Sequence, residues 1–66
     1  MKEKPAIVFT FPDCMGGVSS FNRNIINYYK QERGYRTRVI LLNDQEDERP
    51  RFRDEIDADE VLTFDY

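Results

Sequence analysis

Two unbroken apolar runs flank a helix-forming stretch, and a pair of glycines separates the first run from that stretch. The first run covers residues 6–11, the glycines are residues 16–17, and the second run lies within residues 37–42. Apolar runs without polar alternation are typical of parallel strands that are covered on both faces. The succession of strand, helix and strand therefore predicts an α/β fold, a Rossmann-like β-α-β unit with parallel strands.

Between the glycines and the second run, apolar residues recur at intervals of three and four, as on one face of an amphipathic helix. They are Val18, Phe21, Ile25 and either Tyr28 or Tyr29, with Ile26 widening the stripe. We expect this stripe to cover the sheet, with polar residues such as Asn22 and Arg23 on the other face. The pattern stops at Gly34, where a left-handed helix cap is expected.

Beyond the second run the patterns are shorter. Residues 43–50 are mostly acidic or polar and end in a proline, so we expect a solvated connection. Phe52 and Ile56 are spaced for one helical turn, and residues 60–64 predict a third strand. This order leaves one side of the sheet bare. Residues 1–66 are therefore expected to be the N-terminal portion of an incomplete three-layer domain, truncated before a second domain.

The length of 66 residues limits the core, because a chain of this size buries only ~60% of its unfolded surface. Its single cysteine, Cys14, excludes an internal disulfide, and the absence of histidine makes a structural zinc site unexpected. We predict no bound metal and no cofactor. The chain is expected to be a homo-oligomer, such as a dimer, or a piece of a larger protein.

Charge and hydropathy exclude several classes of partner. The formal net charge is −3 and the basic residues are scattered among acids, which argues against a nucleic-acid surface. No apolar stretch approaches the twenty residues of a membrane span. The start of the chain lacks the pattern of a signal peptide, and its lone thiol favours a cytoplasmic location.

The double glycine is the strongest candidate for a ligand site. Ligands of open α/β sheets bind at the carboxyl ends of the strands, where this turn is expected. Glycine lacks a Cβ, so its backbone can adopt positive φ and a ligand can approach it closely. Backbone N–H groups at a helix N-terminus suit a phosphate or another anion. Gly16, Gly17 and Val18 are therefore the candidate phosphate-binding residues, and Asp13 is a candidate polar contact to the substrate.

Each of these residues also has an interpretation without a ligand. The glycines can form a tight strand-to-helix turn, and Asp13 can form an Asx turn with the backbone that follows it. The chain contains neither the dinucleotide fingerprint G-x-G-x-x-G nor the P-loop motif. Other acidic residues are expected to lie in loops, because the pair Asp57 and Asp59 precedes an apolar run instead of following it. Cys14 is expected to be inert, since no histidine is present to serve as its base.

Four short segments of the sequence occur in an order that is typical of one enzyme family. They are Ile7-Val8-Phe9-Thr10-Phe11, Met15-Gly16-Gly17-Val18, Arg33-Gly34-Tyr35 and Thr37-Arg38-Val39-Ile40-Leu41-Leu42. Over residues 6–42 the chain resembles the start of retaining GT-B glycosyltransferases of the group 1 (family 4) type. It departs from that pattern at Ser19-Ser20, where the family often has an acidic residue.

The resemblance implies an N-terminal fragment of a glycosyltransferase. The full-length enzyme would transfer a sugar from a nucleotide-sugar donor to a glycan or lipid-linked acceptor. Gly16 and Gly17 would supply backbone contacts, and Val18 would open the helix that points at the phosphates. Catalytic groups of such enzymes lie largely in a C-terminal donor-binding domain, so no catalytic residue is assigned and the 66-residue chain alone is expected to be inactive. The alternative is a small dimerising α/β binding module with no catalytic activity.

Overall fold

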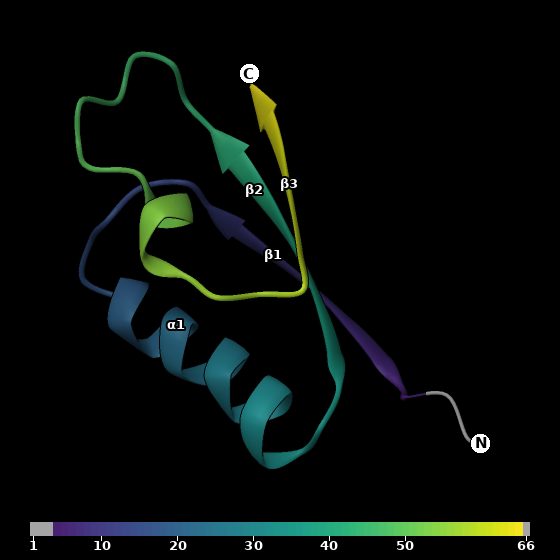
Figure 1. Cartoon of the computed structure of the whole chain (residues 1–66). Helices are drawn as coiled ribbons and strands as arrows, with labels where there is room; N and C mark the ends of the chain where they lie inside the picture. The colour runs from purple at the N-terminus through teal and green to yellow at the C-terminus, as the bar shows by residue number, and fades with distance from the viewer. Residues whose placement is uncertain (1–3, 66) are drawn as a thin grey trace.

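A three-stranded parallel sheet carries helices on one of its faces in the computed structural model, which describes residues 4–65 (Figure 1). In chain order the elements are β1 (Ala6–Pro12), α1 (Ser19–Asn27), the π-helical turn η1 (Tyr28–Glu32), β2 (Arg36–Asn43), the 3-10 helix η2 (Phe52–Glu55) and β3 (Glu60–Asp65). The strand order is β1-β2-β3, and both neighbouring pairs are parallel. The predicted α/β fold, a Rossmann-like and incomplete unit, is confirmed.

The core lies between the sheet and the helices and is built from few residues. Ile26 of α1, Val39 and Leu41 of β2 and Phe52 of η2 are its buried apolar members. The ring of Phe11 meets Phe52 edge-on, with ring centroids 6.1 Å apart. Because β2 is the central strand, its buried side chains contact both crossovers, which makes it the element around which the fold is organised.

The predicted orientation of the helix is confirmed at Ile26, which was expected to widen the apolar stripe, and is wrong at Val18 and Phe21. Ile26 is fully buried and Ser19 is buried, whereas the ring of Phe21 is 65% exposed. The Ser19 hydroxyl donates to the Gly16 carbonyl oxygen at 2.7 Å, which turns this residue toward the loop and the sheet. Ile26 lies seven residues later on the same helical face. The stripe that begins at Val18 is thereby rotated toward solvent.

The helix ends in a wider turn. Residues Tyr28–Glu32 form the π-helical turn η1, and Gly34 follows with a φ of 67°. The predicted left-handed cap at Gly34 is confirmed. Tyr29 packs against Phe9 with ring centroids 5.7 Å apart, so one of the two candidate tyrosines does cover the sheet.

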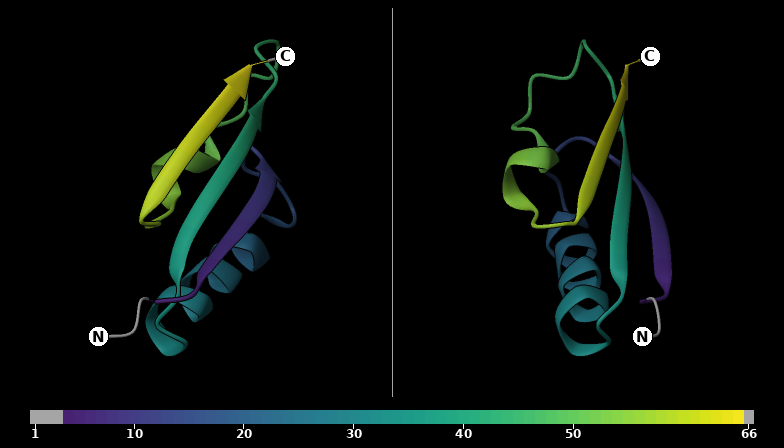
Figure 2. Two further views of the ribbon diagram at one scale, coloured as in Figure 1. Left: turned by 90° about the vertical axis from the view of Figure 1, so that its right-hand side faces the viewer. Right: turned by 45° about the vertical axis from the view of Figure 1, so that its right-hand side comes forward.

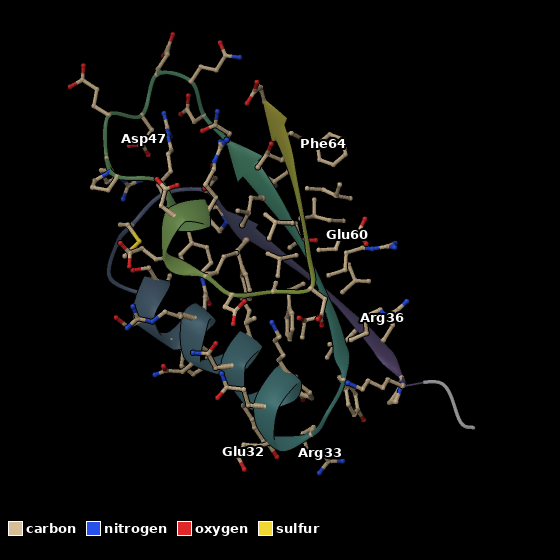
Figure 3. All side chains as sticks on the ribbon, viewed as in Figure 1. Glu32, Arg33, Arg36, Asp47, Glu60 and Phe64 are labelled. Atoms are coloured by element: carbon tan, nitrogen blue, oxygen red, sulfur yellow. The ribbon has the colours of Figure 1, made fainter. Side chains whose placement is uncertain are left out.

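The face of the sheet opposite the helices is open. Both crossovers, through α1 and through η2, lie on the same side (Figure 2). Figure 3 shows the side chains of Arg36, Glu60 and Phe64 directed away from the helices. Phe64 is 56% exposed. The prediction that one side of the sheet is bare is confirmed.

One carboxylate fixes the start of β3 to β2. Asp59 Oδ2 accepts a hydrogen bond from the Thr37 N–H at 2.8 Å and another from the Thr37 hydroxyl at 3.2 Å. The Asp59 N–H donates to the same hydroxyl oxygen at 3.1 Å. The bond from the Thr37 N–H is the main cause that holds the pKa of Asp59 below its ordinary value. Asp57 forms an ion pair with Lys30, so the Asp57–Asp59 stretch has structural contacts of its own.

Replacing Ile26 by alanine should lower the free energy of unfolding by about 2–5 kcal/mol, because a fully buried side chain is removed from a small core. Phe21→Ala changes the same helix on its exposed side and should stay within about 0.5 kcal/mol of the unmodified chain. Urea unfolding followed by circular dichroism measures both variants. Equal losses would mean that Phe21 packs against the sheet.

Acid should weaken the fold partly through Asp59. Its pKa is lower in the folded chain, so its contribution is complete above the ordinary carboxyl pKa of ~3.9 and is lost as the pH falls through the folded-state value. Asp59→Asn should therefore lower the thermal midpoint at pH 7 and should change it less at pH 2. The control Asp54→Asn, in η2, should shift the midpoint little at either pH. A constant difference for Asp59→Asn across this range would contradict the assignment.

Candidate functional site

The turn between β1 and α1 forms one wall of a pocket at the carboxyl ends of the strands. The pocket has a volume of about 220 Å³. Its lining residues come from this turn, from the first turn of α1 and from the loop after β2: Pro12, Cys14, Gly16, Gly17, Val18, Ser19, Asn22 and Arg49. Three of the four predicted site residues, Gly16, Gly17 and Val18, are thus brought together.

Hydrogen bonds between Gly16 and Ser19 shape the turn. The Ser19 N–H and hydroxyl both donate to the Gly16 carbonyl oxygen, at 3.1 and 2.7 Å. The Gly16 N–H donates to the Ser19 hydroxyl oxygen at 3.3 Å. Within residues 4–65, the N–H groups of Gly17 and Val18 form no hydrogen bond, which leaves both available to a ligand.

No side chain caps the N-terminus of α1, so the partial positive charge of the helix dipole is not offset there. Val18 occupies the N-cap position without a side-chain hydrogen bond, and the first turn of the helix contains no acidic residue. The exposed N–H groups of a helix N-terminus carry a partial positive charge. The start of α1 therefore contributes a partial positive charge at the pocket.

At Gly16 and Gly17 the absence of a Cβ matters because it leaves space beside the backbone, since neither glycine has a positive φ. In the described part of the chain, Gly34 is the one residue with a positive φ. A Cβ on Gly16 would lie 3.2 Å from Nη1 of Arg49, whereas a Cβ on Gly17 would meet no atom within 4 Å. Gly16 thus permits the approach of Arg49, and Gly17 leaves its backbone open toward the pocket.

Arg49 is the residue that sequence analysis missed. Its Nε and Nη2 are held by the Asp47 carboxylate, at 3.0 and 2.7 Å from the nearer oxygens, while Nη1 points at Gly16. The pair holds the pKa of Asp47 well below its ordinary value, with the hydrogen bond from Arg49 as the main cause, and it raises the pKa of Arg49. Arg49 therefore presents a permanently charged and oriented guanidinium to the pocket.

The loop that carries Arg49 is fixed to the glycine turn by backbone contacts. The Met15 N–H donates to the Pro50 carbonyl oxygen at 2.9 Å. Nη2 of Arg51 donates to the Asp47 carbonyl oxygen at 2.7 Å. Residues 43–50, expected to be a solvated connection, are mostly exposed, and the path of this loop brings Arg49 and the glycine turn to one pocket.

Asp13, the fourth predicted site residue, contacts η2 and does not line the pocket. Its carboxylate is buried and accepts hydrogen bonds from the Arg53 N–H at 3.0 Å and from Arg53 Nε at 2.7 Å, and it also forms an ion pair with Arg53 Nη2. These contacts anchor η2 to the end of β1. The contact of Asp13 with a substrate stays a prediction.

Two further polar side chains lie near the carboxyl ends of the strands, Cys14 and Asn43. Cys14 is half-buried and lines the pocket. Asn43 donates from Nδ2 to Asp65 at 2.7 Å, and its Oδ1 is buried without a partner in the described chain. Within residues 4–65 no group of three His, Cys, Asp or Glu side chains is arranged to hold a metal ion. Over the same residues, no helix has the length and hydropathy needed to cross a membrane.

The glycines should respond differently to alanine. Gly34→Ala should cost about 1–2 kcal/mol, because an L side chain is strained at a φ of 67°. Gly17→Ala should stay within about 0.5 kcal/mol of the unmodified chain, because its Cβ would meet open space. Urea midpoints compare the two variants. A larger loss for Gly17→Ala would show that this turn needs glycine for its backbone conformation.

Comparison with known proteins adds no relative: no protein-family model, no curated protein and no solved structure matches this chain.

Proposed function

We propose that this chain is the N-terminal, phosphate-facing part of a glycosyltransferase that uses a nucleotide-sugar donor. The observation that carries the proposal is the position of Arg49 Nη1 against the glycine turn. A guanidinium, two unused backbone N–H groups and an uncapped helix N-terminus surround one small pocket. A diphosphate offers the negative charge and the acceptor oxygens that these donors require.

The chemistry that follows is electrostatic. In sugar transfer the bond between the sugar and the diphosphate breaks, and negative charge grows on the departing diphosphate. Fixed donors aimed at that charge stabilise the transition state without having to reorganise. Gly17, Val18 and Arg49 are the residues proposed for this role. The groups that activate the glycan or lipid-linked acceptor belong to other parts of the full-length protein, so the chain alone is inactive. The proposed compartment is the cytoplasm.

A second candidate function is a small dimerising α/β binding module without catalytic activity. The open face of the sheet, with Phe64 more than half exposed, offers a surface on which another chain can pack and so favours a binding role. Assays of sugar transfer by the natural polypeptide distinguish the two candidate functions. If it consumes a nucleotide-sugar, and if Gly17→Val abolishes the transfer, the first candidate stands. Binding of phosphate without any sugar transfer supports the second.

The phosphate site can be tested directly on the chain. Inorganic pyrophosphate, titrated into ¹⁵N-labelled protein, should shift the amide signals of Gly17 and Val18. Arg49→Ala should weaken the binding about tenfold, the effect of one lost charged hydrogen bond. The matched control is Arg33→Ala, which removes an arginine at the end of η1 that does not line this pocket and should leave the affinity unchanged. Equal weakening by both variants would mean that pyrophosphate follows overall charge and has no site at the glycine turn.

A further inference from the structure

The open face of the sheet has two chemically different halves. Strand pairing places Ile40 beside Leu62 and Leu42 beside Phe64, which makes the half near the carboxyl ends of the strands apolar. Three of these side chains are exposed: Leu42, Leu62 and Phe64. An apolar patch of adjacent side chains on one face marks a place where another element packs.

The other half of the open face is charged along β2 and β3, beside the exposed Val8 of β1. Arg38 and Glu60 lie side by side in the strand register and form an ion pair at 2.7 Å. Arg36 lies two residues before Arg38 on the same face and forms no ion pair with any described residue. Positive charge is therefore left over at this end of the face.

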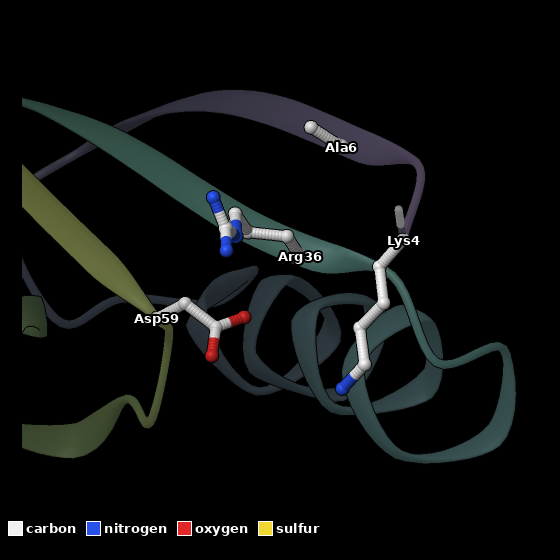
Figure 4. A pocket seen from close by; sticks show the side chains of 4 residues that line it. All are labelled: Lys4, Ala6, Arg36 and Asp59. Atoms are coloured by element: carbon white, nitrogen blue, oxygen red, sulfur yellow. The ribbon is translucent and has the colours of Figure 1, made fainter. Parts of the chain in front are cut away.

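A second unpaired cation lies next to Arg36. Lys4, Ala6, Arg36 and Asp59 line a pocket of about 460 Å³ at the amino ends of the strands (Figure 4). Lys4, like Arg36, has no ion pair within the described chain. Asp59 already receives two hydrogen bonds from Thr37. The pocket thus combines two cations with one ionised carboxylate, which leaves one positive charge in excess.

Under the second candidate function, a binding module, we propose that the open face docks an amphipathic helix of a partner protein, with its apolar stripe over Leu42, Leu62 and Phe64 and its acidic end against Arg36 and Lys4. The strand rises ~20 Å from Arg36 to Leu42 at ~3.3 Å per residue. That span equals about 13 residues of α-helix. A helix antiparallel to the strands places its C-terminal, negative pole at the two cations, so its dipole adds to the attraction of its acidic side chains.

A second copy of this chain fits the same face less well. Two copies stacked with their strands in the same direction bring both charged halves against one another, and each half carries two arginines, Arg36 and Arg38, but only one glutamate, Glu60. Stacking in opposite directions lays the Arg38–Glu60 ion pair of one copy on the apolar half of the other, which removes the pair from water without a new partner. An acidic helix satisfies both halves at once.

A designed peptide of about 14 residues tests the proposal on the full chain. It carries leucines at helical spacing and two glutamates at its C-terminus, and a matched peptide ends in two lysines. Fluorescence anisotropy should show the glutamate peptide binding about fivefold more tightly or better. Phe64→Glu should weaken its binding about tenfold or more. The control Phe21→Glu, on the exposed side of α1, should have no effect.

Arg36→Glu tests the charge preference independently, because it reverses the charge of an exposed side chain and leaves the apolar half of the face intact. It should reverse the preference, so that the lysine peptide binds more tightly. Circular dichroism confirms that each variant is folded. The proposal is overturned if both peptides bind the unmodified chain equally, or if Phe64→Glu leaves peptide binding unchanged. It is also overturned if sedimentation shows a dimer that Phe64→Glu dissociates while the unmodified chain binds neither peptide.

Discussion

The buried carboxylate of Asp13 holds this small fold together. It receives the N–H and the guanidinium of Arg53, and so binds the short helix η2 to the end of β1. The helix brings with it Phe52, one of the few fully buried apolar side chains. A chain without a disulfide has no covalent substitute for such a contact. This one pair of residues therefore fixes the position of η2 and its core residue Phe52.

The candidate site is built from two short parts of the chain that meet at the carboxyl ends of the strands. One turn supplies N–H groups and the positive end of a helix, and one distant loop supplies a guanidinium. The contact of Met15 with Pro50 is what joins them, since it fixes the loop that positions Arg49 over Gly16. The glycine at position 16 makes room for that arginine.

Local pattern was enough to predict the strands, the short helical turn at Phe52 and the left-handed cap at Gly34, because each depends on neighbouring residues. The rotation of α1 could not be predicted in this way. Its apolar stripe was consistent with a buried face, but the hydroxyl of Ser19 bonds to Gly16 and turns the helix by one residue. The position of Arg49 next to Gly16 could not be predicted either, because it depends on a loop whose path is set by tertiary contacts.

The three-strand order has a consequence for the behaviour of the chain at high concentration. Strands β1 and β3 are both edges, so each presents unpaired backbone N–H and C=O groups along one side. The free side of β3 in one molecule can pair in parallel with the free side of β1 in the next. Such a contact is heterologous and does not close on itself, so repeated pairing extends a continuous sheet into a fibre. Along β3 itself the charged residues stand at its two ends, Glu60 and Asp65, and they are what opposes this growth from that strand.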